Sequence, residues 1–484
     1  MEREIVIAKV SRISIHRKWS RGYMQKEYQV VIVGSGPSAI FAALTLTRNG
    51  VKDIAIFEKG KDIHERKRER GMELLCGWGG AGAFSDGKLT LSPKVGGFLS
   101  EFVPQTELMD LLKKVDDIYI SFGAPKEVQG QSSDKTEALY QEAKQAGLEF
   151  IPMEIRHLGT ENCAPLLKEI RGAMRDKVDI FFKTPVKEIL VEGGKVTGVL
   201  LHNGSQVKAQ YVICGPGRVG AEWTKNEVER LEIPSVPSPV DIGVRVEAPA
   251  SILLKLTDIA YEAKFIYYSK TFDDRVRTFC MNPFGEVVTE TIDEIITVNG
   301  HSYAKRKTEN TNFAILVSSA FTEPFNDPIG YGKYIARLAN LLGNGVIIQR
   351  LGDLLDGRRS TPDRINRCIT QPTLTSATPG DLSFVLPYRH LKSIIEMLEA
   401  LDRITPGIYS RHTLLYGVEV KFYTNRLKLS PTLETDIRNL FLIGDGAGIT
   451  RGLIQASISG IISANEIVKR MGKEKRIQKR DEGS

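Results

Sequence analysis

The sequence predicts an α/β fold organised around a parallel sheet. Residues 29–58 have the order of a βαβ unit: a β-branched run, a glycine-rich turn, an apolar helix and a second apolar run. Near the other end, the apolar run 440–443 leads into another glycine-rich turn and an apolar helix, 453–470. Between them, short β runs separated by Gly-Gly and Asn-Gly pairs predict antiparallel hairpins over 179–214. Strands that alternate with helices in this way are typical of the α/β class.

The other elements follow from apolar spacing and turn residues. Residues 1–26 form a basic arm before the first strand. Helical spacing predicts helices over 107–119, 134–145, 161–175, 331–342 and 389–401. Strands are predicted at 241–246, 265–268, 276–281 and 313–318. The proline-rich stretch 233–239 is typical of a crossing between domains, and we expect residues 471–484 to form a charged, disordered tail.

The net charge of +7 belongs to the two ends of the chain. Residues 1–26 carry +5 and residues 469–484 carry +4, so the residues between them carry −2. Nucleic-acid binding by the body of the protein would need a basic surface there, so no DNA partner is predicted. Binding of RNA or of an anionic surface would depend on the two basic ends.

Cysteines and apolar segments indicate the compartment. Five cysteines without a CxxC pair do not predict a disulfide framework, so the reducing cytoplasm is the expected location. No signal peptide is indicated, and the longest apolar stretch, 30–46, is interrupted by residues 34–38. A membrane span needs about 20 apolar residues, so none is predicted. The seven histidines show no metal-ligand spacing, so no metal site is predicted.

The turn at residues 34–39 has the features of a dinucleotide-binding site. Gly34 permits a tight turn, Gly36 has no Cβ to block a pyrophosphate, and Ala39 allows close packing of helix and strand. Pro37 and Ser38 belong to the first helical turn, where amide groups and the helix dipole favour an anion.

Glu58 and Lys59 follow the second strand and complete this motif. The carboxylate of Glu58 can accept hydrogen bonds from both ribose hydroxyls of a dinucleotide, and it would repel a 2′-phosphate. A glycine turn without a ligand is the alternative. The strand before the turn, the helix after it and the acid at the second strand end all favour the dinucleotide.

A second glycine-rich turn, Gly444–Gly448, follows a strand and precedes a helix. By itself it indicates either an anion-binding turn with a carboxylate beside it or a plain connection. Together the two motifs resemble the FAD-binding pair of the glutathione-reductase-type flavoproteins. This resemblance implies FAD as the cofactor, with Asp445 at its ribityl and pyrophosphate region and Val186 beside its adenine. It also implies that Gly215 and Gly217 form the turn that leads back to the FAD-binding domain.

Three further segments resemble a narrower family of bacterial and archaeal FAD-dependent dehydrogenases. They are the loop 77–90, the stretch 278–283 and residues 444–460. The part from 77 to 88 has five glycines, so its backbone can approach a flavin closely, and we place Gly79, Gly80 and Ser85 at the cofactor. A flexible surface loop is the alternative.

The resemblance also implies a discontinuous domain, because motifs about 410 residues apart converge on one cofactor. We predict that this Rossmann-type FAD-binding domain, a parallel sheet plus a β meander, comprises 27–115, 148–235 and 402–470. Residues 116–147 are predicted to be a helical excursion. An α+β substrate domain is expected at 236–401.

The implied function is an FAD-dependent oxidoreductase that passes a hydride or an electron pair between an organic small-molecule substrate and the flavin. Cys280 and Asn282 resemble the strand end that related reductases direct at the flavin and are the candidate catalytic residues. A lone cysteine in an apolar β run is more often a small hydrophobic residue of the core. Arg451, a cation at a helix start, indicates an anionic neighbour such as an FAD phosphate or the substrate, or else a surface ion pair.

Three alternatives accompany this reading. Residues 215–220 also have the GxGxxG form, but no second strand ending in an acid follows, so NAD(P)H is expected only as a transient electron donor. A flavoprotein that acts on RNA would use the basic ends. A membrane-surface reductase of isoprenoids or quinones would need an exposed apolar patch within 240–400.

Overall fold

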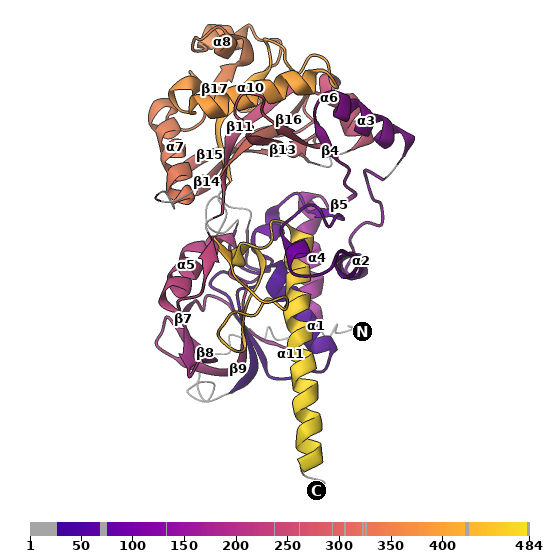
Figure 1. Cartoon of the computed structure of the whole chain (residues 1–484), viewed down its shortest axis with the longest axis vertical. Helices are drawn as coiled ribbons and strands as arrows, with labels where there is room; N and C mark the ends of the chain where they lie inside the picture. Colours follow the sequence, from indigo (N-terminus) through magenta and orange to yellow (C-terminus); the bar gives the residue numbers. More distant parts are fainter. Residues whose placement is uncertain are drawn as a thin grey trace, which may run out of the picture.

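The computed structural model describes residues 27–67, 75–131, 133–236, 238–260, 262–292, 294–303, 306–321, 324, 327–421 and 425–481. The predicted basic arm, 1–26, lies outside the described residues, as do residues 482–484. The described chain forms two domains, one above the other in Figure 1, and each has its own hydrophobic core.

The sheet of the first domain draws parallel strands from three parts of the chain. They are β1 (Tyr28–Val33), β2 (Ile54–Phe57), β6 (Asp179–Phe181), β9 (Gln206–Cys214) and β21 (Leu440–Leu442), with β21 pairing with β9. Val30, Val31 and Ile32 have no exposed surface, as expected for a strand covered on both faces. The meander adds β7 (Val186–Glu192) and β8 (Lys195–Leu201) in antiparallel order to β9. The predicted α/β fold with a parallel sheet and a meander is confirmed.

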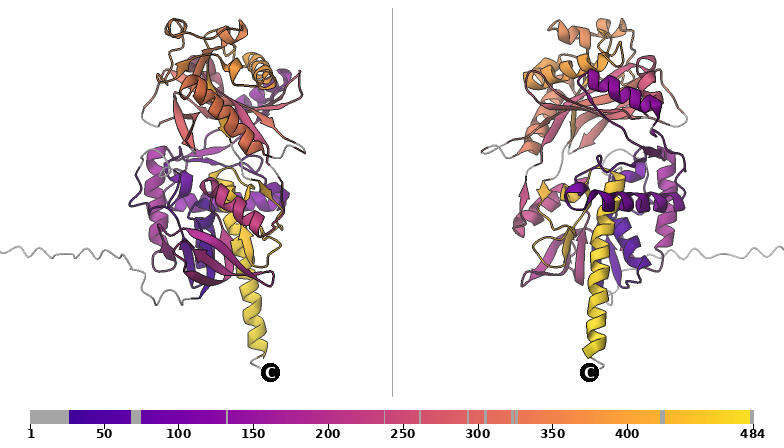
Figure 2. Two further views of the ribbon diagram at one scale, coloured as in Figure 1. Left: turned by 90° about the vertical axis from the view of Figure 1, so that its left-hand side faces the viewer. Right: turned by 45° about the vertical axis from the view of Figure 1, so that its right-hand side comes forward.

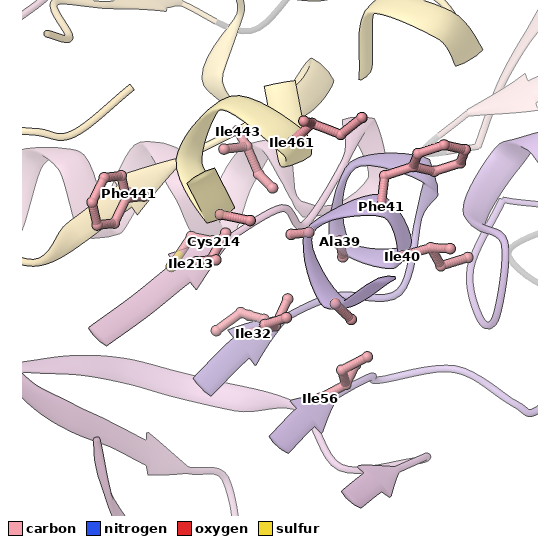
Figure 3. Close-up of a cluster of buried hydrophobic side chains, with 14 of the residues drawn as sticks. Ile32, Ala39, Ile40, Phe41, Ile56, Ile213, Cys214, Phe441, Ile443 and Ile461 are labelled. Atoms are coloured by element: carbon pink, nitrogen blue, oxygen red, sulfur yellow. The ribbon is translucent and has the colours of Figure 1, made fainter. Parts of the chain in front are cut away.

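Two helices from opposite ends of the sequence lie together on this sheet. They are α1 (Pro37–Arg48) and α11 (Leu453–Asp481). Figure 3 shows Ile461 of α11 between Ile443, which follows β21, and Phe41 of α1. The two helix backbones approach closely at Gly460, where a Cβ would lie 2.0 Å from the carbonyl oxygen of Ser38.

The C-terminal residues differ from their prediction. We expected a disordered tail over 471–484, but α11 continues to Asp481 and projects from the domain (Figures 1 and 2). The Lys, Arg, Glu and Gln residues of this segment are strong helix formers, and after Gly472 it contains neither glycine nor proline up to Asp481. Within the described part of the chain, no helix combines the length and the apolar character that a membrane crossing requires.

The rest of the first domain consists of shorter elements around the sheet. They are β3 (Lys88–Thr90), β5 (Ile155–His157), β10 (Ser235–Val236), β20 (Arg426–Leu427), α2 (Gln105–Ser121), α4 (Thr160–Ala173) and α5 (Ala221–Arg230). β3 and β5 pair with each other, as do β10 and β20.

The second domain is an eight-stranded sheet with helices on one face (Figure 1). Its strands, in spatial order, are β18 (Thr378–Pro379), β17 (Ile347–Arg350), β19 (Leu414–Lys421), β11 (Val240–Pro249), β16 (Asn310–Ser319), β13 (Arg275–Asn282), β12 (Lys264–Tyr268) and β4 (Glu149–Ile151). The covering helices are α3 (Asp134–Gln145), α6 (Ala250–Ile259), α7 (Pro328–Gly343) and α10 (Tyr388–Asp402). A hairpin of β14 (Glu286–Ile292) and β15 (Ile295–His301), with the short helices α8 (Leu351–Leu355) and α9 (Pro362–Asn366), completes it.

The division between the domains differs from the predicted one in two places. We predicted 148–235 and 402–470 for the first domain, but β4 pairs with β12, and β19 lies between β11 and β17 in the second sheet. The predicted excursion 116–147 also contributes α3 to the second core. These apolar segments would suit either core, because periodicity shows that a strand is buried but not which strand it pairs with.

Candidate active site

Three glycine turns meet at the carboxyl edge of the parallel sheet. Gly34 has a φ of 92°, and a Cβ on it would lie 2.4 Å from the carbonyl oxygen of Gly215. A Cβ on Gly444 would lie 2.7 Å from the Oγ of the buried Ser38. The structure therefore brings these four predicted residues together. In open α/β sheets this edge is where ligands bind.

Gly36 differs from its neighbours because its surroundings are open. It precedes the first turn of α1, no side chain caps that turn, and a Cβ on Gly36 would meet no atom within 4 Å. The first amide groups of a helix have no acceptor within the helix and favour an anion. This arrangement fits the pyrophosphate of a dinucleotide.

Replacing Gly36 with alanine tests this interpretation. The added methyl group has space in the protein, so we expect an unchanged melting temperature together with at least tenfold weaker cofactor binding. Gly34→Ala is the contrasting variant, because its Cβ meets backbone and its φ is strained, so it should lower the melting temperature. Full cofactor retention by Gly36→Ala would contradict the site.

The carboxylate of Glu58 is buried and held in one orientation. Its Oε2 accepts a hydrogen bond from the Oγ of Ser35 at 2.7 Å. Its Oε1 accepts from the backbone N–H groups of Gly60 at 2.7 Å and Gly77 at 3.2 Å. Only 6% of Glu58 is exposed. The carboxylate thus joins the dinucleotide turn to the start of the glycine-rich loop and is held in a fixed orientation.

The turn after β9 lies on the same side as Glu58. The Nζ of Lys59 donates to the carbonyl of Val219 at 3.3 Å. Gly217 has a φ of 64°, and a Cβ on it would meet no atom within 4 Å. Val186 is buried in the first strand of the meander and lies opposite Leu201. Gly36 and Gly217 are therefore both open positions, and the hydrogen bond of Lys59 to Val219 brings the turn after β9 close to the strand end that carries Glu58.

The glycine-rich loop packs directly on the dinucleotide turn. The N–H of Gly79 donates to the carbonyl of Ser35 at 2.8 Å. A Cβ on Gly80 would lie 3.2 Å from the Cα of Gly36, so a larger residue there would crowd the turn. Ser85 uses its hydroxyl within the loop, where it donates to Gly82 and accepts from Gly87. The predicted surface-loop alternative does not describe this packing.

Sequence reasoning missed the residue that holds this loop. The guanidinium of the buried Arg66 donates to the carbonyls of Trp78 at 2.6 Å and Gly80 at 3.0 Å, and lies over the ring of Phe84. Its neighbours in the sequence are mixed charges, which is typical of a solvated helix face. No local signal distinguishes Arg66 from them.

The second glycine turn presents a partly buried carboxylate. The Oδ1 of Asp445 accepts from the hydroxyl of Thr450 at 2.7 Å, and its Oδ2 lies 3.6 Å from the Nε of Arg218. Burial raises the pKa of Asp445, and the nearby Arg218 opposes that rise. Gly448 ends the turn with a φ of 71°. The fixed Asp445 stands at the carboxyl end of β21, where the FAD resemblance requires it.

Arg451 lies just before α11 and contacts the chain that follows the glycine-rich loop. Its N–H donates to the carbonyl of Gly96 at 2.6 Å, and its guanidinium lies over the ring of Phe98 at 4.7 Å. It also acts electrostatically on Asp241 and Lys264 in the second domain. The structure places Arg451 just before α11, and its role beside an FAD phosphate or the substrate stays a prediction.

The candidate catalytic residues lie at the irregular end of β13. Cys280 has a φ of 47°, and its carbonyl accepts from the Nη1 of Arg245 at 2.9 Å and from the amide of Asn282 at 2.8 Å. Asn282 has no exposed surface, and its Oδ1 has no hydrogen-bond partner among the described residues. Burial raises the pKa of the Cys280 thiol, so it stays neutral at pH 7.

Lys88 joins the glycine-rich loop to this strand end. Its Nζ donates to the carbonyl of Met281 at 3.0 Å and forms ion pairs with Asp86 at 3.1 Å and Glu262 at 3.0 Å. The ammonium group thereby connects the first domain to the second beside Cys280. The loop and the strand end therefore lie together, as the resemblance implied.

A family comparison decides the cofactor. Residues 239–422 match the family described as "FAD-dependent protein, C-terminal domain-like". The chain carries an FAD-dependent protein domain. FAD is accordingly its cofactor, as predicted, and the prediction of an FAD-dependent enzyme is confirmed at this level. The matched range also ends close to the last residue of β19, in agreement with the boundary that the sheet shows.

The chain as a whole is also similar to other proteins. An uncharacterised protein of Clostridium beijerinckii is 27% identical over 476 residues, which is 91% of this chain and 80% of that protein. Among solved structures, a geranylgeranyl bacteriochlorophyll reductase-like protein from Thermoplasma acidophilum is 12% identical, with a TM-score of 0.38, over 93% of this chain and 80% of that one. The glycine oxidase of Geobacillus kaustophilus is 12% identical, with a TM-score of 0.37, over 92% and 95%. These scores are too low to transfer a substrate.

Proposed function

We propose that this protein is an oxidoreductase that passes a hydride or an electron pair between an organic substrate and FAD. The observation that carries the proposal is the meeting of the two domains at Lys88. There the loop that packs on the dinucleotide turn is joined to the end of β13 in the FAD-dependent domain. The sheet edge that fits the cofactor and the strand end that resembles a flavin-facing one thus belong to one site.

The chain's part in this function is to hold and orient the cofactor. Gly36, Gly217 and the first turn of α1 would hold the pyrophosphate side of FAD, Glu58 its ribose, and Asp445 its ribityl region. Bound FAD supplies the redox chemistry. The second domain covers this edge, and the buried Asn282 fixes the carbonyl at the bend of β13. The five cysteines are all free, which supports a cytoplasmic enzyme.

Anaerobic flavin reduction tests the proposal. The purified protein should contain about one FAD per chain, and a panel of organic metabolites should include compounds that bleach the flavin. NADH and NADPH belong in the panel, and we expect at most slow, transient reduction by either. A protein that binds no flavin, or a flavin that no compound in the panel reduces, would contradict the proposed function.

Replacing Cys280 with serine tests the predicted catalytic position. We propose that Cys280 contacts the substrate or the flavin as a neutral thiol. The variant should then change the rate of substrate-dependent flavin reduction by about threefold or more while the FAD content stays constant. Cys368→Ser is the control, because Cys368 is buried in a separate small core of the second domain. Equal rates for Cys280→Ser and the parent protein would assign Cys280 to packing.

A further inference from the structure

The face of the second sheet that is free of covering helices carries charged side chains. Alternate residues of a strand point to one face, so Asp241 and Arg245 of β11 share a face with Arg277 of β13. Lys264 of β12 lies on this face too, two residues from Ile266, the register partner of Arg277. The core of the domain lies on the opposite face. This charged face is turned toward the first domain (Figure 1).

Most of the cations on this face have a carboxylate partner. Arg277 pairs with Asp241 at 2.6 Å, and the fully buried Arg245 pairs with Glu419 at 2.8 Å. Lys421 also lies 3.1 Å from Glu419. Lys88 of the first domain forms ion pairs with both Asp86 and Glu262, as described above.

Lys264 is the exception. Among the described residues, no carboxylate forms an ion pair with its Nζ, and the side chain is half-buried. Its charged surroundings are Arg277, Arg275 and Arg451, together with Glu262, whose carboxylate already pairs with Lys88. Burial, Arg277, Arg275 and Arg451 lower the pKa of Lys264 to about 8, so the ammonium form still predominates at pH 7.

A partly buried cation without a partner favours an anion beside it. Arg277, Arg275 and Arg451 surround Lys264, and the carboxylates in this group are Asp241, which pairs with Arg277, and Glu262, which pairs with Lys88, so the surroundings of Lys264 carry a net positive charge. The half-buried ring of Phe279, 4.7 Å from the guanidinium carbon of Arg277, supplies apolar surface beside the charge. The combination suits a small organic acid.

We propose that the substrate carries a carboxylate and that Lys264 binds it at the interface between the domains, with Arg277 and Phe279 beside it. This inference rests on the proposed function, since it assigns a substrate class to the same site. Lys264 is a binding residue in this assignment. The carboxylate would complete the pairing of charges on the sheet face.

Matched probes test the proposal on the FAD-loaded protein. Benzoate and hexanoate, with their neutral isosteres benzamide and hexanamide, are titrated against the visible absorbance of the oxidised flavin. At least one carboxylate should bind at least tenfold tighter than its amide. Lys264→Met should weaken that binding at least tenfold, and Lys264→Arg should retain most of it.

Two controls keep the test specific. Lys255→Met removes an exposed lysine of α6 that pairs with Glu142, and it should bind the carboxylate as the parent protein does. The melting temperature and FAD content of Lys264→Met should match the parent, because Lys264 has no ion pair to lose. If neither carboxylate exceeds its amide, or if Lys264→Met binds it unchanged, the proposal is wrong. If Lys264→Met loses FAD, Lys264 serves the cofactor and the proposal is equally wrong.

The proposed function and this inference can fail separately. A parent protein that binds no FAD would contradict the proposed function. Calorimetric titration of the flavin-free chain with the same four probes would still decide whether Lys264 selects a carboxylate. If only neutral compounds reduce the flavin, the proposed oxidoreductase function is supported and the proposal of a carboxylate substrate is wrong.

Discussion

Replacing Glu58 with glutamine is expected to leave the protein folded and to lower its affinity for FAD at least tenfold. The glutamine oxygen can accept from the N–H groups of Gly60 and Gly77, while its NH₂ group donates to Ser35. The protein contacts therefore survive. The oxygen that would accept a ribose hydroxyl becomes a donor, and a hydrogen bond to a charged group contributes about 1.5–3 kcal/mol.

Flavin absorbance per protein after gel filtration measures this effect, and thermal unfolding confirms the fold. Glu65→Gln is the matched control, because Glu65 is exposed and its ion pair with Lys183 lies at the surface. Its FAD content should equal that of the parent. An undiminished flavin content in Glu58→Gln would remove Glu58 from the cofactor site.

Replacing Gly460 with alanine should produce the largest loss of stability. The new Cβ would lie 2.0 Å from the carbonyl oxygen of Ser38 and 2.9 Å from the backbone nitrogen of Ala42. Both atoms belong to the backbone of α1, so the two helices must move apart. Overpacking of this kind costs about 3 kcal/mol. The melting temperature of the first domain should fall by roughly 5–10 °C.

Gly472 offers a control on the same helix. A Cβ there would meet no atom within 4 Å, so Gly472→Ala should leave stability unchanged or raise it by up to about 1 kcal/mol through helix propensity. Differential scanning calorimetry of both variants separates a packing effect from a propensity effect. Equal melting temperatures for the two variants would show that the helices do not pack as closely as described.

The motifs that sequence reasoning located are local in the chain. The turn at 34–39 and Glu58 lie within one βαβ unit, so the strand, helix and strand around them define their place. The same holds for Asp445, which stands between a strand and a helix. Their meeting at one sheet edge follows from parallel pairing, and the structure shows the three glycine turns in contact.

What could not be predicted depends on pairing between distant segments. β4 and β19 are apolar strands whose partners lie in the second sheet, and nothing in their own residues assigns them there. Lys264 and Arg66 look like ordinary charged residues in the sequence. Their importance comes from what surrounds them: three arginines in one case, two backbone carbonyls of a loop in the other.

Because β21 lies near the end of the chain, its position determines when the first sheet can be completed during synthesis. β9 pairs with a strand synthesised about 230 residues later, and every strand of the second sheet except β4 is translated in the interval. At ribosomal speeds of about 5–20 residues per second, the edge of β9 waits on the order of 10–50 s for its neighbour. The inserted domain can fold during that time. The carboxyl edge of the first sheet, and with it the place for FAD, is completed last.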